Sequence, residues 1–333
     1  MQATTTREWA DPATNGLAQT TGRARMRVLA ILNVHGKAAA SLGRERIHPR
    51  VAEAFAAAGV DATIELVRGA ELVPALQTAL GARAAGETFA FDALVVGGGD
   101  GTIGTAAAHL AGTGIPLGVL PLGTLNHFAR DLRIPDQLEL ACMVIAECNA
   151  QTVDIAEVNG QTFVNNASIG IYPYMLEIRD RQRRALGLGK WGAMVLAFGW
   201  MMRRFPMHRL TIRTGEGERR RKTPCAFIGN NRYAVEGAAL GTRAALDRGE
   251  LCVYVARSAS RLHLLWVLLK AAFGRMRPLL DFDEIRAEAL TIDSRAHRLR
   301  VALDGELRKM VPPLRYRSRP GALRVLAPRL GID

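Results

Sequence analysis

The sequence predicts an α/β domain followed by a mainly β domain, which we expect to be a β-sandwich of two packed sheets. In the first half, apolar strand-like segments alternate with segments of helical periodicity, which favours a mostly parallel sheet flanked by helices. After about residue 150, short strand-like segments follow one another with turn residues between them. We therefore expect a leader at residues 1–25, an α/β domain at 26–150 and a β-sandwich domain at 151–328.

The first unit is a strand, a loop and a helix. "MRVLAIL" at 26–32 is a buried strand that ends at Asn33, and the loop "NVHGK" follows it. Apolar residues then recur at helical spacing from Ile47 to Ala58, and Gly59 ends the helix. The alternation continues with the strand "DATIELV", a helix through Leu72 to Leu80, the strand "FDALVVG", a helix over 106–110 and the strand "IPLGVLP".

The second half begins with "TVDIAEV" and includes a predicted hairpin around "TGEGE". Two apolar runs, at 191–202 and 262–273, interrupt the strands and are expected to be helices. Both fall short of the ~20 residues that a membrane-spanning helix needs. The polar leader lacks the apolar core of a signal peptide, so we expect a disordered leader and a cytoplasmic protein.

Composition favours an anionic partner. The 333 residues carry a formal net charge of +13, which fits nucleic acid, anionic lipid or nucleotide phosphate. Aromatic residues make up only 6% and no nucleic-acid recognition module is evident, which argues against nucleic acid. The four cysteines have no metal-like spacing, so we expect neither a disulfide nor a zinc site.

The stretch "VVGGGDGTIG" at 95–104 places five glycines and one acid between a strand and a helix. It contains a literal GxGxxG, but the acid that a dinucleotide fold places about 20 residues later is missing. An ordinary P-loop is excluded because no GxxxxGK[ST] is present. Backbone N–H groups of such a loop can approach phosphates while Asp100 holds magnesium. The alternative is a tight strand-to-helix turn without a ligand.

Two further motifs decide between these interpretations. "LPLGTLNHFARDL" at 120–132 follows the next strand, and "DGE" at 304–306 ends a later one. With "GGDGT" at 98–102, they resemble the diacylglycerol-kinase-like lipid kinases. The resemblance implies an N-terminal nucleotide-binding domain of the NAD-kinase/phosphofructokinase-like type and a β-sandwich lipid-binding domain. It also implies transfer of the γ-phosphoryl group of ATP to a lipid hydroxyl, with Mg²⁺ as cofactor.

The resemblance also assigns roles to residues. Glu306 is the expected general base, supported by Asp304 on what should be one extended segment that Gly305 lets turn. Asp100 should organise magnesium, and Asp154 should join it through water. The nucleotide-binding set comprises Asn33, Lys37, Gly98, Gly99, Gly101, Thr102, Gly123, Thr124, Asn126 and Arg130. Two positions depart from the family pattern: His127 and Arg248 each stand where relatives usually carry aspartate.

The expected partners are a lipid alcohol and an anionic membrane surface, with a homodimer left open. Basic residues flank the two apolar runs, which suits peripheral docking on the inner face of the membrane; they are Arg179–Arg184, Lys190, Arg203, Arg204, Arg275 and Arg277. The alternative functions are a soluble-substrate kinase of the NAD-kinase type and a catalytically silent lipid-binding module.

Overall fold

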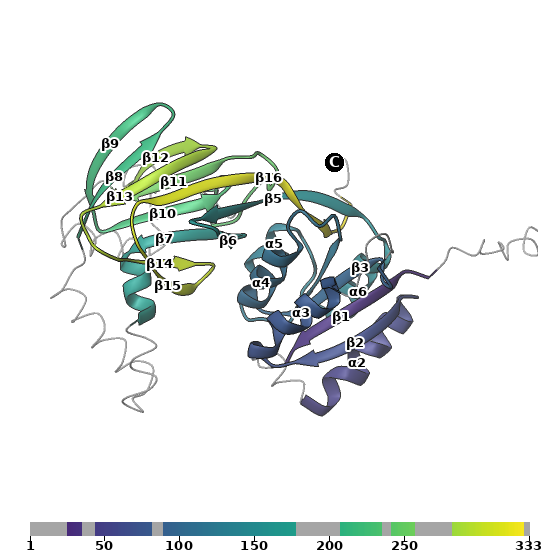
Figure 1. The fold of residues 1–333 in the computed structure, drawn as a ribbon. Helices are drawn as coiled ribbons and strands as arrows, with labels where there is room; N and C mark the ends of the chain where they lie inside the picture. The colour runs from purple at the N-terminus through teal and green to yellow at the C-terminus, as the bar shows by residue number, and fades with distance from the viewer. Residues whose placement is uncertain are drawn as a thin grey trace, which may run out of the picture.

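The computed structural model describes residues 25–34, 44–81, 89–177, 207–234, 241–256 and 282–329. These residues form two lobes, an α/β lobe and a lobe of packed sheets, with β5 and β16 running from one to the other (Figure 1).

The α/β lobe is built on four parallel strands in the order β2, β1, β3, β4. Every residue of β3 and β4 is buried, as expected for parallel strands covered by helices on both faces. The strands and helices of this lobe are β1 (Arg27–Asn33), α2 (Arg44–Ala57), β2 (Asp61–Val67), η1 (Gly69–Glu71), α3 (Leu72–Gly81), β3 (Ala93–Gly98), α4 (Asp100–Leu110), β4 (Leu117–Pro121), α5 (His127–Asp131) and α6 (Leu138–Ala146).

The second lobe is a β-sandwich. A six-stranded sheet in the order β12, β11, β10, β7, β14, β15 packs its apolar side chains against those of β5, β8, β13 and β16. The strands are β5 (Ala150–Val158), β6 (Gln161–Phe163), β7 (Asn166–Gly170), β8 (His208–Thr214), β9 (Gly217–Thr223), β10 (Cys225–Asn230), β11 (Leu251–Ala256), β12 (Phe282–Ala287), β13 (Ala289–Ser294), β14 (Leu299–Leu303), β15 (Glu306–Met310) and β16 (Leu314–Leu326).

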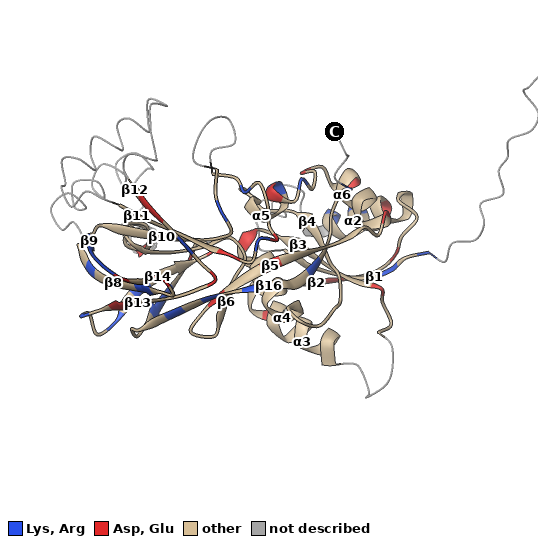
Figure 2. Cartoon of the chain, turned by 90° about the horizontal axis from the view of Figure 1, so that it is seen from above, with Lys and Arg blue, Asp and Glu red and all other residues tan. Residues whose placement is uncertain are grey.

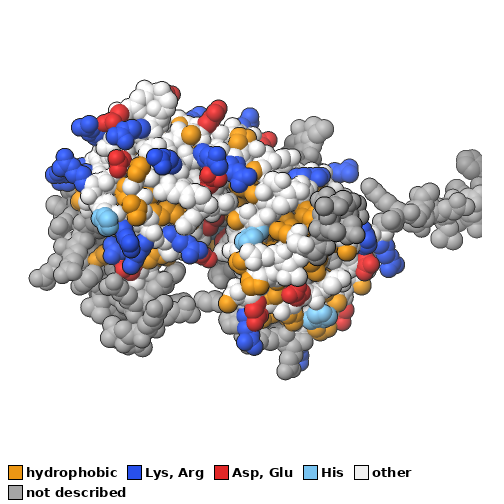
Figure 3. All heavy atoms as spheres, in the orientation of Figure 1, with side chains coloured by type: hydrophobic (Ala, Val, Ile, Leu, Met, Phe, Trp, Pro, Cys, Tyr) orange, Lys and Arg blue, Asp and Glu red, His pale blue; other side chains and the backbone are white. Residues whose placement is uncertain are grey.

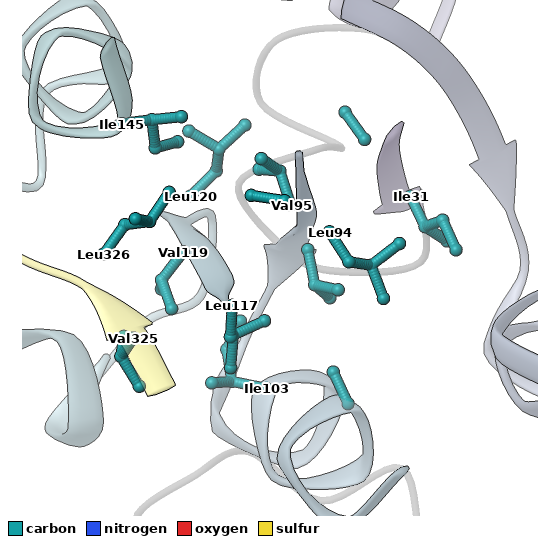
Figure 4. Close-up of a cluster of buried hydrophobic side chains, with 14 of the residues drawn as sticks. Ile31, Leu94, Val95, Ile103, Leu117, Val119, Leu120, Ile145, Val325 and Leu326 are labelled. Carbon is teal, nitrogen blue, oxygen red and sulfur yellow. The ribbon is translucent and has the colours of Figure 1, made fainter. Parts of the chain in front are cut away.

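The long strand β16 belongs to both lobes. Its first part pairs with β13, and at its end Val325 pairs in parallel with Leu117 of β4. The side chains of Val325 and Leu326 are fully buried in the core of the α/β lobe, beside Leu117 and Val119 (Figure 4). The ten-stranded sheet is therefore continuous from the α/β lobe into the sandwich.

The predicted fold class, an α/β domain followed by a β-sandwich, is confirmed. The strand at 61–67 matches β2, Gly59 follows α2 with a φ of +73°, and β8 and β9 form the hairpin around "TGEGE". The boundary near residue 150 stays a prediction. The apolar runs at 191–202 and 262–273 lie outside the described residues, and within those residues no helix is long and apolar enough to cross a membrane.

Candidate active site

The first glycine loop joins β3 to α4. The carbonyl of Gly99 accepts the N–H groups of Thr102 at 2.9 Å and Ile103 at 3.0 Å, which closes the first turn of the helix. The N–H groups of Asp100 and Gly101 precede these bonds, as the first N–H groups of a helix do. With the positive end of the helix dipole, they form a place where an anion is stabilised.

The second glycine loop, between β4 and α5, lies directly against the first. A Cβ atom on Gly123 would come within 2.5 Å of the Cα of Gly99, so only glycine fits there without moving backbone. The N–H of Leu122 donates to the carbonyl of Gly98 at 3.1 Å, which ties the loops together. The two glycine motifs, separate in sequence, therefore form one backbone surface.

Asn126 shapes the second loop from within. Its φ of +50° places it in the left-handed region, and its side chain is buried. The amide oxygen accepts the N–H of Gly123 at 3.0 Å, while the amide nitrogen donates to the carbonyl of Pro121 and to Asp136, both at 3.1 Å. These bonds fix the shape of the second glycine loop.

The "DGE" motif reaches this surface from the other lobe. Oε1 of Glu306 lies at the start of α4, where a Cβ added to Gly101 would come within 2.8 Å of it. Oε2 of Glu306 accepts a hydrogen bond from Nη2 of Arg308 at 2.8 Å, and the Glu306 side chain is half-exposed. The structure therefore brings a solvent-accessible carboxylate to the first turn of the helix that begins with Asp100.

Asp304 and Glu306 do not share one extended segment, so that expectation was wrong. Leu303 pairs with Glu306 across a hairpin, and Asp304 and Gly305 form its turn with φ values of +45° and +84°. The turn sends the two carboxylates to different partners. Asp304 is held inside the protein, where it accepts the N–H groups of three successive residues: Val164 at 2.8 Å, Asn165 at 2.8 Å and Asn166 at 3.0 Å.

Burial raises the pKa of Asp304 above its ordinary value, and the three backbone N–H groups oppose that rise because they favour the charged form. A carboxylate that already accepts three hydrogen bonds has few lone pairs left to accept a proton or a hydrogen bond from a substrate hydroxyl. Its geometry makes it an anchor for the turn that carries Glu306.

The other predicted nucleotide-binding residues are placed as follows. Asn33, at the end of β1, donates from Nδ2 to Oγ1 of Thr102 at 3.0 Å, and the buried Thr102 side chain packs over Gly98. Thr124 and Arg130 are exposed, and Arg130 makes no ion pair within the described part of the chain. Lys37 lies outside the described residues.

The carboxylate of Asp154 is buried and engaged in hydrogen bonds. Its carboxylate accepts the N–H groups of Gly249 at 2.6 Å and Gly321 at 2.8 Å, and the amide of Asn231 at 3.1 Å. No described contact joins it to Asp100. Since N–H donors already surround its oxygens, the arrangement does not support the expectation that Asp154 joins a magnesium ion. Arg248 adds only a backbone N–H, which donates to Asn231 at 3.1 Å.

Asp100 fits magnesium better. Oδ1 of Asp100 accepts a long hydrogen bond of 3.4 Å from the backbone N–H of Phe128. Among the described residues, no group of three or more His, Cys, Asp or Glu side chains could hold a metal by itself. Mg²⁺ is commonly bound by one or two carboxylates together with substrate phosphates, and Asp100 suits that mode.

Sequence analysis missed Asp131 and Arg243. They form an ion pair of 2.7 Å whose side chains are 5% and 0% exposed. The only local signal of Arg243 in the sequence is that it stands alone among small residues in "GTRAAL".

Family models cover most of the chain. Residues 27–158 match the diacylglycerol kinase catalytic domain, and residues 177–327 match the YegS C-terminal NAD kinase beta sandwich-like domain.

Individual proteins agree with these matches. A probable lipid kinase YegS-like protein of Pseudomonas fluorescens is 31% identical over 314 residues, which are 90% of this chain and 95% of that protein. A diacylglycerol kinase of Mycobacterium tuberculosis is 29% identical over 246 residues, 72% of this chain and 78% of that protein. A crystal structure of a diacylglycerol kinase from Bacillus anthracis shares the fold, with a TM-score of 0.63 at 20% identity over 92% of this chain and 98% of that one.

Proposed function

The chain belongs to the family defined by the diacylglycerol kinase catalytic domain, and we propose that it transfers the γ-phosphoryl group of ATP to a lipid hydroxyl. The acceptor class is diacylglycerol or a related lipid alcohol. The observation that carries this proposal is the approach of Glu306 to Gly101, which puts a carboxylate beside the anion-binding end of α4.

The two glycine loops would bind the phosphates. Their backbones meet at Gly99 and Gly123, two residues without side chains, close to the N–H groups at the start of α4. A helix N-terminus supplies both hydrogen-bond donors and a favourable dipole to an anion. The exposed Arg130 and Thr124 can approach the nucleotide from α5 and from the loop before it.

Asp100 would hold magnesium together with the phosphates. A bound Mg²⁺ neutralises charge on the β- and γ-phosphate oxygens, which is a large share of catalysis in phosphoryl transfer. The remaining work belongs to the chain: the loops orient the phosphates, Asp100 begins α4, and Oε1 of Glu306 lies near Gly101.

Glu306 would act as the general base. It accepts the proton of the acceptor hydroxyl as the hydroxyl oxygen forms a bond to the γ-phosphorus. The bond between that phosphorus and the bridging oxygen breaks, and its electron pair leaves on ADP. Arg308, bonded to Oε2 of Glu306, orients the carboxylate so that Oε1 faces the first turn of α4.

We also propose that the protein docks on a membrane surface of anionic lipid. The segments that first suggested it, 179–184, 190, 203–204 and 275–277, lie outside the described residues. In the described part, the exposed strand β9 carries a basic run, basic residues lie on the strands of the sandwich lobe in Figure 2, and basic side chains gather over that lobe in Figure 3; the run consists of Arg219, Arg220, Arg221 and Lys222.

The function is tested with γ-labelled ATP, magnesium and a total lipid extract, followed by identification of the labelled product. Our proposal predicts a phosphorylated lipid that Asp100→Asn protein does not form. Labelling of NAD, without labelled lipid, would instead favour a soluble-substrate kinase. Lipid binding without turnover on any lipid alcohol would favour a catalytically silent module.

A further inference from the structure

Arg243 and Asp131 form a buried ion pair between the lobes. Nε of Arg243 donates to Oδ2 of Asp131 at 2.7 Å, and the Arg243 backbone N–H donates to Oδ1 at 3.2 Å. Asp131 ends α5, which follows the second glycine loop, whereas Arg243 lies between β10 and β11 of the sandwich. The side chains of Arg243 and Asp131 are 0% and 5% exposed, so each charge depends mainly on its partners for stabilisation.

The rest of the guanidinium holds the segment before β7. Nη1 donates to the carbonyl of Val164 at 2.7 Å and to that of Asn230 at 3.0 Å. Nη2 donates to Oδ1 of Asn165 at 2.8 Å. All three guanidinium nitrogens of Arg243 are therefore engaged, and two of the groups that they hold belong to Val164 and Asn165.

The segment of Val164 and Asn165 also anchors the turn of Asp304 and Gly305, which leads to Glu306. The backbone N–H groups of Val164 and Asn165 donate to Asp304, two residues before Glu306. A continuous path of hydrogen bonds thus runs from the end of α5, through Arg243 and Val164–Asn165, to Asp304. It starts at the end of α5, which follows the second glycine loop, and ends at Asp304, whose Oδ2 lies near Gly104 of α4.

We propose that Arg243 and Asp131 are positioning residues, which fix the turn of Asp304 to Glu306 against the glycine loops. This role rests on the proposed function. Neither side chain is placed to touch substrate, so both act through Val164, Asn165 and Asp304. An arginine is needed because its planar fork serves several acceptors at once, whereas a lysine ammonium is a point charge.

The test compares Arg243→Lys with a matched control, Thr223→Val. Thr223 is fully buried in the sandwich, and its hydroxyl lies within hydrogen-bond distance of the carbonyls of Cys225 and Ala256, at 2.8 and 3.0 Å. No described contact links it to Asp304. Each variant loses buried hydrogen bonds. Arg243→Lys should lower kcat by about 10-fold or more with KM for ATP changed less than about threefold, because misplaced groups lose transition-state geometry. Thr223→Val should keep kcat within about twofold.

Hydrogen exchange of backbone amides supplies a second readout, which needs no lipid substrate. In Arg243→Lys, the amides of Val164, Asn165 and Asn166 should exchange at least about 10-fold faster, while those of β1 keep their wild-type rates. If Arg243→Lys does not fold, Asp131→Asn replaces it, since it keeps the side-chain shape and removes one charge. The same pattern is expected at smaller amplitude.

Unchanged exchange at Val164–Asn166 in folded Arg243→Lys would overturn the inference, as would an equal loss of kcat in Thr223→Val. Wild-type protein that phosphorylates no lipid would remove the proposed function instead. The exchange measurement would then still decide whether Arg243 holds the segment that anchors Asp304.

Discussion

Oε1 of Glu306 lies so near Gly101 that a Cβ atom on Gly101 would stand 2.8 Å from it. The two residues are separated by most of the chain, and one belongs to each lobe. Their approach joins the late acidic motif to the early glycine loop.

Gly101→Ala should separate activity from stability. The new methyl group meets the flexible end of Glu306, so the fold can accommodate it by moving that side chain. Alanine in a helix is favoured over glycine by up to about 1 kcal/mol, so stability should hold or rise. We expect kcat to fall by about 10-fold or more as Glu306 is displaced.

The control is Gly81→Ala, at the end of α3, where an added Cβ meets no atom within 4 Å. Steady-state kinetics and thermal unfolding of both variants provide the check. Wild-type kcat in Gly101→Ala would contradict the assigned position of the base.

Asp100→Asn should lower turnover and keep stability, whereas Asp154→Asn should lower stability and keep the magnesium dependence. Asp100 has an accessible carboxylate, so its amide should cut turnover by more than about 100-fold with little change in unfolding temperature. Asp154 is 2% exposed and holds three donors, so its amide should lower the unfolding temperature and leave the magnesium dependence unchanged. Magnesium titrations of activity, with melting curves, distinguish the two. A changed magnesium requirement in Asp154→Asn would restore Asp154 to the metal site.

Docking on anionic lipid should depend on salt. Activity on anionic vesicles should fall steeply as salt rises, because screening acts on exposed charges such as those of β9. Activity on neutral detergent micelles should hardly change. Equal salt sensitivity on both surfaces would argue against electrostatic docking.

His208 should make stability depend on pH. Burial, helped by the charge of Arg300, lowers the pKa of His208 from its ordinary value of 6.5. The folded state therefore disfavours the charged ring, so this contribution to stability is present above about pH 6.5 and is lost as pH falls through the lower folded pKa.

Urea unfolding at about pH 7.5 and about pH 5.5 measures the effect. His208→Gln should lose less stability between those values than the wild type does. An identical loss in both proteins would assign the pH dependence to other groups.

Sequence patterns predicted local structure well where one physical rule dominated. Two apolar runs, each followed by a glycine motif, predicted a parallel sheet with both loops at one end. The runs form β3 and β4, which are buried throughout. The "DGE" turn was harder. A period-two pattern suggested one extended segment, but the positive φ of Asp304 and Gly305 makes a hairpin turn, and Asp304 bonds backbone that is 138 residues or more away in sequence.

Long-range partners were the part that local patterns could not supply. The end of β16 pairs with β4, more than 200 residues earlier in the chain, and its alternating sequence fits a strand in either lobe. Arg243 stands alone among small residues in the sequence, but its partners could not be predicted locally, because its acceptors come from α5, β10 and the segment before β7. Such contacts are set by the topology of the whole sheet.

The most direct test of the account is single-turnover phosphoryl transfer with ATP and lipid acceptor both saturating, in wild-type protein and in Glu306→Gln. If Glu306 takes the acceptor proton, the rate constant should fall by about 100-fold or more with ATP affinity nearly unchanged, and adding Asp304→Asn should make it little worse. A near-wild-type rate constant in Glu306→Gln, alongside an inactive Asp304→Asn, would contradict the assignment and move the base to Asp304.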